Sequence, residues 1–185
     1  LCAAPPRVRK PILGSASRQA PDGDVQHWGH PPAGRGVRTM CSDEYLGLPF
    51  VTERYVTVTG DTGILDEKIR FIEGRPLRED EESYYDLPQK SEEKVTLYEH
   101  CKRSIGHGLR FGGHGLPLMG SGDWNDGMDL VGCGGKGESV WLAFFLHSVL
   151  AGFAGIADAK GDAAYATSCR EQATRLAANI ESHAW

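Results

Sequence analysis

The densest group of polar and aromatic side chains lies between Gly122 and Gly127 and has the sequence Asp-Trp-Asn-Asp. A pyranose ring has a C–H face that stacks on an indole and hydroxyls that bond to carboxylates and amides, so Trp124 and its neighbours suit sugar binding. They also suit acid catalysis, because an indole and a second carboxylate both raise the pKa of a nearby carboxyl group. Such a group can protonate the oxygen of a leaving sugar. The run therefore predicts a carbohydrate site with one aspartate as the acid.

Two other interpretations of the same run stay open at this point. In the first, Asp123 and Asn125 cap turns and Trp124 belongs to the core of a tight loop. In the second, Asp123, Asn125, Asp126 and Asp129 supply oxygen ligands to calcium, although the alternating spacing and the closing glutamate of an EF-hand are missing. Composition alone does not separate a capped loop from an acid site.

A second cluster of polar residues occupies residues 24–43. His27 and His30 have a spacing that suits a metal, but no third ligand with sensible spacing accompanies them, so we expect no metal site. Arg38 and Asp43 are placed at the expected start of a helix, where a ligand hydroxyl or a phosphate would meet both side chains and free N–H groups. An ion pair that fastens the start of the helix explains them equally well.

Several classes of function lack support in the sequence. Residues 132–137 resemble a phosphate loop only loosely, since the GxxxxGK[ST] spacing is missing and no strand is expected before them, and this argues against a nucleotide site. No Gly-x-Ser-x-Gly segment and no Cys/His pairing indicates acyl transfer. The net charge of −5 is spread over the chain without a basic stripe, so we expect neither nucleic acid nor an anionic membrane surface as a partner.

Cysteine usage and hydropathy predict a cytoplasmic location. The five cysteines are odd in number and widely spaced, without a CxxC pair, which argues against a disulfide framework and a zinc knuckle and favours a reducing compartment. The longest apolar stretch, residues 140–156, is shorter than the roughly 20 residues of a membrane-spanning helix and contains polar and glycine residues. We expect it to be a core helix.

The periodic segments that must position these residues have helical spacing. Helices are expected at about residues 42–60 with a kink at Pro49, 64–71, 95–109, 138–155 and 158–182, a charged loop at 75–93, and a glycine-rich loop region at about 106–137. No convincing sheet is visible. The sequence therefore predicts one all-α domain over residues 1–185, part of an α/α barrel whose long glycine-rich loops form the site. A closed barrel needs about twice as many helices, and the chain begins at Leu1 rather than Met, so we expect a fragment of a longer polypeptide.

Residues 114–128 and 135–141 closely resemble the catalytic stretch of glycoside hydrolase family 94. Residues 23–28, 34–43, 59–62 and 97–101 support the likeness, which covers nearly the whole chain. Within that family the sequence is most similar to the C-terminal domain of cyclic β-1,2-glucan synthases and to 1,2-β-oligoglucan phosphorylases, more than to cellobiose or chitobiose phosphorylases.

The resemblance implies an (α/α)6 barrel in which Asp126 is the general acid and Trp124, Arg38 and Asp43 line the sugar subsite before the scissile bond. Inorganic phosphate, the co-substrate, attacks the anomeric carbon from the opposite face and releases glucose 1-phosphate from a β-glucan oligosaccharide, and no other cofactor is implied. This fits the single acid, because an inverting hydrolase needs a second carboxylate to activate water, whereas phosphate is already an anionic nucleophile. The resemblance also implies a homodimer, in the cytoplasm or as the cytoplasmic domain of a larger inner-membrane protein.

The chain departs from the family pattern at Gly29 and Gly47, where tryptophan is expected in close relatives. The phosphate-binding residues of the family are expected beyond residue 185. A catalytically inert helical fragment that binds carbohydrate, or that is purely structural, is therefore the alternative interpretation.

Overall fold

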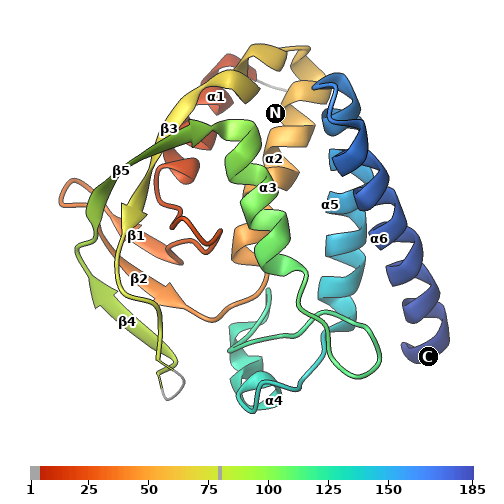
Figure 1. Ribbon diagram of the computed structural model, residues 1–185. Coiled ribbons are helices and arrows are strands. Elements are labelled where there is room, and N and C mark those ends of the chain that lie inside the picture. Colours follow the sequence, from red (N-terminus) through yellow and green to blue (C-terminus); the bar gives the residue numbers. More distant parts are fainter. Residues whose placement is uncertain (1–4, 79–80) are drawn as a thin grey trace.

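A layer of helices packs beside a smaller β region in the computed structural model, which describes residues 5–78 and 81–185 (Figure 1). The helices are α1 Pro5–Ala16, α2 Glu44–Thr59, α3 Leu97–Gly108, α4 Asp129–Gly132, α5 Val140–Ala159 and α6 Ala163–His183, with 3-10 turns at Thr62–Asp66 and Asp126–Met128. The strands are β1 Trp28–His30, β2 Arg35–Thr39, β3 Lys68–Glu73, β4 Ser83–Asp86 and β5 Gln89–Thr96. The candidate site loops, residues 109–139, run below the helical layer in Figure 1.

The hydrophobic core lies between the long helices. Leu146 and Phe153 of α5 are fully buried, and Leu176 of α6 and Leu46 of α2 are 1% exposed. α5 and α6 form an antiparallel pair, and α2 packs on both α3 and α5. The helices predicted at 42–60, 95–109, 138–155 and 158–182 are confirmed to within a few residues, and α2 continues without interruption through Pro49. α1 was not predicted.

Two antiparallel sheets contradict the expectation that the chain is all-α. β1, β2 and β4 form one sheet in that order, and β3 pairs with β5 in the other. The helix predicted at 64–71 is wrong: a 3-10 turn ends at Asp66, and residues 68–73 are β3 with an alternating exposure in which Phe71 alone is fully buried. The loop predicted at 75–93 contains β4 and the start of β5. A strand is recognised by apolar residues at every second position, and the many charged residues of these strands hid this alternation in the sequence.

Buried polar groups join the β region to the helices. His100 of α3 is fully buried, and its ring nitrogens lie 2.6 Å from Gln19 Oε1 and 3.1 Å from the carbonyl oxygen of Ile69 in β3. Burial lowers the pKa of His100, which favours the neutral ring. Gln19 Nε2 donates to Ser104 Oγ at 2.6 Å. This histidine is a hydrogen-bonded core residue.

Among the described residues, α5 is the one helix whose length and composition would allow it to cross a membrane, and half of its apolar window is buried in this structure. Its buried side chains pack against α2 and α6. The expected core helix is thus found at this position.

Candidate active site

The glycine-rich loop that carries the Asp-Trp-Asn-Asp run is docked on the segment between β2 and α2. Ser121 N donates to the carbonyl oxygen of Met40 at 3.1 Å, and Ser42 N donates to that of Gly122 at 2.9 Å. Gly120 has φ +68°, and a Cβ there would overlap the Met40 carbonyl oxygen. A side chain at this position would therefore separate the two segments.

Asp123 fixes the run to the start of α5. Its side chain is buried, and its two carboxylate oxygens accept from Ser139 Oγ at 2.5 Å and from Asn125 N at 3.0 Å. Ser139 Oγ in turn accepts from Leu142 N at 3.0 Å and caps α5. Both carboxylate oxygens of Asp123 therefore accept hydrogen bonds from the protein itself, and this residue, predicted to bind sugar, holds the loop in place.

The remaining residues of the run face solvent. Trp124 is 62% exposed, which contradicts the interpretation that it belongs to the core. Asn125 Oδ1 accepts from Gly127 N at 3.1 Å and caps the 3-10 turn that begins at Asp126, an exposed residue. No donor among the described residues binds the Asp126 carboxylate. The capped loop and an accessible carboxylate thus occur together.

Asp43 lies across from the run, at the N-terminal end of α2. It makes no side-chain capping hydrogen bond and is half-buried. Burial raises the pKa of Asp43, and the negative charges of Asp123 and Asp126 raise it further. The pKa of the buried Cys41 thiol is raised in the same way, first by burial and then by Asp126 and Asp43. The negative charge of Asp126 thus acts on the pKa of Asp43, and both are predicted site residues.

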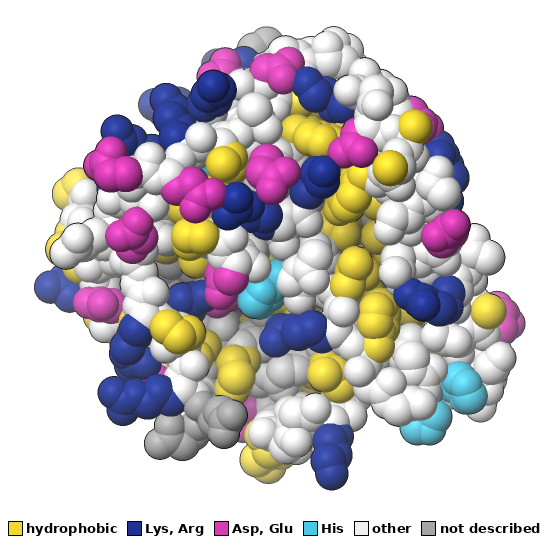
Figure 2. All heavy atoms as spheres, in the orientation of Figure 1, with side chains coloured by type: hydrophobic (Ala, Val, Ile, Leu, Met, Phe, Trp, Pro, Cys, Tyr) yellow, Lys and Arg dark blue, Asp and Glu magenta, His cyan; other side chains and the backbone are white. Residues whose placement is uncertain are grey.

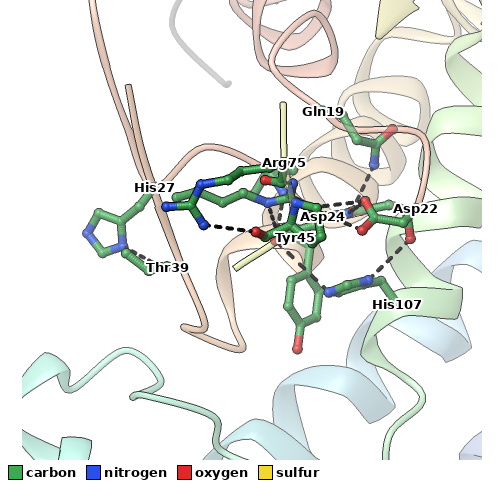
Figure 3. A network of polar contacts seen from close by, with 12 residues as sticks. Gln19, Asp22, Asp24, His27, Thr39, Tyr45, Arg75 and His107 are labelled. Carbon is green, nitrogen blue, oxygen red and sulfur yellow. Dashed lines mark hydrogen bonds and ion pairs between the residues drawn. The ribbon is translucent and has the colours of Figure 1, made fainter. Parts of the chain in front are cut away.

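Arg38 lies in β2 rather than at the start of a helix. Its guanidinium donates to Asp24 Oδ2 at 2.5 Å, to Asp22 Oδ2 at 3.0 Å and to the carbonyl oxygen of Arg75 at 3.1 Å. Asp24 and Asp22 raise the pKa of Arg38, although burial acts in the opposite direction. The ion pair of Arg38 with Asp43 that the sequence suggested at the start of a helix is therefore wrong: Arg38 pairs with Asp24 and Asp22. Figure 3 shows Asp22 and Asp24 beside His107 in this network.

Three side chains of types that bind metals converge next to this network. The ligand atoms of His27, Cys41 and Glu44 lie within 4.8 Å of one another, and this is the one such group among the described residues. His27 Nδ1 is paired with Glu44 Oε1, while His30 Nδ1 lies 2.9 Å from the hydroxyl of Tyr85. His27 and His30 are therefore engaged with different partners. The expectation that His27 lacks further ligands was made along the chain, and it missed the fold that brings His27 to Cys41 and Glu44 of another segment.

A row of aromatic rings continues from Trp124 along α5. The centroids of Trp124 and Trp141 are 6.0 Å apart, Trp141 is 5.4 Å from Phe145, and Phe145 is 5.3 Å from Phe50. Trp141 is 40% exposed. Sequence reasoning did not select Trp141, although its place two residues after the Ser139 cap is a usable signal. Two neighbouring exposed indoles offer apolar faces for more than one sugar ring.

The two glycines at positions where the resemblance leads us to expect tryptophan have different surroundings. A Cβ at Gly29 would overlap the guanidinium of Arg18, which fills the space beside the backbone. No atom lies within 4 Å of a Cβ built at Gly47. A larger residue at Gly29 therefore requires Arg18 to move, whereas Gly47 faces open space.

Comparison with known proteins supplies further findings. The family described as glycosyl hydrolase 94 superfamily, catalytic domain, matches residues 1–185. The chain is 44% identical over 159 residues to cyclic beta-(1,2)-glucan synthase NdvB of Rhizobium meliloti (strain 1021), a match that covers 85% of this chain and 6% of that protein. It is 30% identical over 145 residues to cellobionic acid phosphorylase of Neurospora crassa (78% and 16%) and 29% identical over 148 residues to solabiose phosphorylase of Paenibacillus borealis (79% and 17%). The chain thus spans 6 to 17% of the length of these curated relatives.

Proposed function

The chain belongs to the glycosyl hydrolase 94 superfamily, and from this premise we propose that it carries the acid side of a site for inverting phosphorolysis of β-glucosidic bonds, with Asp126 as the general acid. One observation supports this most directly. Asp126 is the carboxylate of the run that is exposed and that no described donor binds, and it stands on a capped turn next to the exposed Trp124.

In the proposed reaction, Asp126 donates its proton to the glycosidic oxygen as the bond from that oxygen to the anomeric carbon breaks. An oxygen of inorganic phosphate forms the new bond to the anomeric carbon from the opposite face, so the configuration inverts. The products are glucose 1-phosphate and a glucan shortened by one unit. No second carboxylate is required to activate the nucleophile, since phosphate is already an anion.

Trp124 and Asp43 form the proposed sugar subsite. The exposed indole of Trp124 supplies a face for the pyranose ring, and Asp43, across the site, accepts a hydrogen bond from a sugar hydroxyl. Asn125 borders the same surface and holds the turn. Arg38 lines the subsite from β2 with its guanidinium fixed by Asp24 and Asp22, and Asp123 positions the run.

The proposed substrate is a β-1,2-glucan oligosaccharide. Support comes from the 44% identity to a protein named as a cyclic beta-(1,2)-glucan synthase, which exceeds the identities of 30% and 29% to the two phosphorylases compared above. Those phosphorylases carry the names of other sugars, which is why the linkage must be tested. Their names support phosphate as the co-substrate.

The setting of the whole protein is part of the proposal. We place the residues that bind phosphate outside this segment and the protein in the cytoplasm, free or as the cytoplasmic domain of a larger membrane protein. The cysteines that the structure describes, Cys41, Cys101, Cys133 and Cys169, are all free thiols, which supports a reducing compartment. A homodimer remains a proposal from the family resemblance.

The test uses the full-length protein with inorganic phosphate and a panel of β-linked disaccharides and oligoglucans, and it measures sugar 1-phosphate. We expect glucose 1-phosphate from β-1,2-glucan, and a loss of about 10²–10⁴-fold in turnover for Asp126→Asn with glucan binding retained. Asp129→Asn, three residues along the chain, is the matched control and should keep its activity. Turnover of Asp126→Asn at the wild-type rate would contradict the assignment of the acid.

A carbohydrate-binding segment without catalysis is the second candidate, because the exposed pair Trp124 and Trp141 suits sugar stacking by itself. The same experiment separates the two. Glucan binding without sugar 1-phosphate formation in the wild-type protein would favour the binding function.

A further inference from the structure

A groove of about 830 Å³ lies outside the candidate active site, between α1, the turn from β1 to β2, and the sheet of β3 and β5. None of the residues assigned above to catalysis or sugar binding lines it. Its volume is in the range of small-molecule sites. We call it the basic groove, after the side chains that surround it: Lys10, Arg18, Lys68, Arg70, Lys90 and Lys94.

The charge of the basic groove is of one sign. Six of its lining residues are cationic, and no aspartate or glutamate lines it, although the whole chain has a net charge of −5. Figure 2 shows lysine and arginine side chains at the upper left, where Figure 1 places α1, β3 and β5. The cations come from four separate segments of the chain, so no basic stripe is visible in the sequence. For this reason the expectation that the chain has neither a nucleic acid nor an anionic membrane surface as a partner did not take this surface into account.

Few of these charges have a partner within the protein. Arg70 is 3.1 Å from Glu92, whose side chain is 92% exposed, and such an exposed pair is weak. Within residues 5–78 and 81–185, no carboxylate forms an ion pair with any of the other five cations of the basic groove. The groove therefore has free capacity for an anion.

The pairing of β3 with β5 adds an unfavourable contact that an anion would relieve. Arg70 stands directly opposite Lys94, and Ile72 stands opposite Lys90. Like charges directly across a sheet are destabilising. An anion bound over Arg70 and Lys94 would attract both side chains and so offset their repulsion.

Arg18 is a cation of the basic groove that lies against Gly29. Its guanidinium fills the space where a Cβ of Gly29 would stand, and it forms no side-chain hydrogen bond with the described residues. A partly buried guanidinium without an acceptor favours an anionic ligand with oxygen atoms. The absence of a side chain at Gly29 thus leaves room for Arg18, a residue that lines the groove.

The floor of the basic groove is apolar, with Leu13, Ile72 and Leu87 among its lining residues. We propose that the groove binds a phosphate-bearing anion, at a place separate from the proposed sugar site. Compact ammonium groups and a guanidinium are the side chains that bind phosphate oxygens. Free pyrophosphate and the headgroup of an anionic lipid share this chemistry, and the experiment distinguishes them.

The test measures calorimetric binding of pyrophosphate and of inorganic phosphate, and sedimentation with vesicles of phosphatidylcholine alone or mixed with phosphatidylglycerol. The groove variant is Lys90→Gln/Lys94→Gln. The control, Arg170→Gln/Arg175→Gln, removes the same charge from α6, on the other side of the helical layer (Figure 1). We expect the groove variant to lose about tenfold or more in affinity, the control to lose less than about twofold, and binding of the wild type to weaken with salt.

The variant should fold, because it removes the repulsion between Arg70 and Lys94 and so should melt no lower than the wild type. Arg18→Gln, in a different segment, should weaken binding in the same direction. Pyrophosphate binding without sedimentation on phosphatidylglycerol vesicles indicates a free anion, and sedimentation on these vesicles without pyrophosphate binding indicates a lipid headgroup. Equal losses in the groove and control variants, or no binding of any of these probes by the wild type, would overturn the proposal. Asp126→Asn should bind the probes normally, so this result is independent of the proposed reaction.

Discussion

The link between Asp123 and Ser139 can be tested by Ser139→Ala. The Ser139 hydroxyl makes two contacts at once, donating to the buried Asp123 carboxylate at 2.5 Å and accepting from Leu142 N at 3.0 Å as the cap of α5. Loss of a serine cap costs about 1 kcal/mol, and loss of a hydrogen bond to a charged group costs about 1.5–3 kcal/mol. Since the two share one oxygen, we expect the free energy of unfolding to fall by about 2–4 kcal/mol.

The measurement is urea unfolding followed by circular dichroism, with the slope m compared to that of the wild type. An unchanged m with a lower midpoint shows that the stability, rather than the unfolded ensemble, has changed. Ser139→Thr keeps the hydroxyl and should recover most of the loss. Ser168→Ala, at an exposed position of α6, should change stability by less than about 0.5 kcal/mol.

Activity gives a second readout of the same link. Ser139→Ala should lower turnover in the full-length protein because the run that carries Asp126 is held to α5 through Asp123, whereas Asp126→Asn should lower turnover with unfolding unchanged. A loss of stability below about 0.5 kcal/mol in Ser139→Ala would refute the reasoning, because a buried carboxylate that loses a hydrogen-bond donor should lower the free energy of unfolding by more than that.

The remaining predictions concern the segment opposite the run. Burial raises the pKa of Asp43 above its unfolded-state value. The contribution of Asp43 to stability is therefore fully present below the unfolded-state pKa and is lost as the pH rises through the folded-state pKa. Asp43→Asn should raise the melting temperature near neutral pH and flatten the fall of the melting temperature as the pH rises above the unfolded-state pKa of Asp43. A steeper dependence would contradict this. Gly120→Ala should cost about 1–3 kcal/mol, because φ is +68° and the new Cβ would overlap the Met40 carbonyl oxygen, while Gly134→Ala, with no atom within 4 Å, should be close to neutral in the same unfolding assay.

The sequence predicted the helices well and the strands poorly, for a physical reason. Helices such as α5 bury a wide apolar face, so apolar residues recur at helical spacing over 20 residues. β3 has six residues, and its exposed positions Lys68 and Arg70 face the basic groove, so only Phe71 marks the buried face strongly. A short window with one strong signal does not distinguish a period of two from a period of 3.6.

The candidate site was predictable in its residues and less so in their roles. The composition of the Asp-Trp-Asn-Asp run after Gly122 is enough to select it as a candidate site. That Asp123 is buried while Asp126 is exposed depends on Ser139, which is sixteen positions away from Asp123. The pairing of Arg38 with Asp24 and Asp22 likewise depends on how β2 lies against the preceding loop. Long-range contacts of this kind leave no local signal in one sequence.

The glycines of the site loop show how one observation from the sequence changes meaning in the structure. Their density predicted a long loop that forms the site, and in the structure several of them lie where backbone segments of the chain approach one another closely. A Cβ at Gly120 would overlap the carbonyl oxygen of Met40, one at Gly132 that of Gly120, and one at Gly137 that of Val131. At these three glycines the backbone segments pack directly against one another, with no side chain between them. The glycines therefore hold the loop that carries Asp126 against the segment that leads into α2, where Asp43 lies.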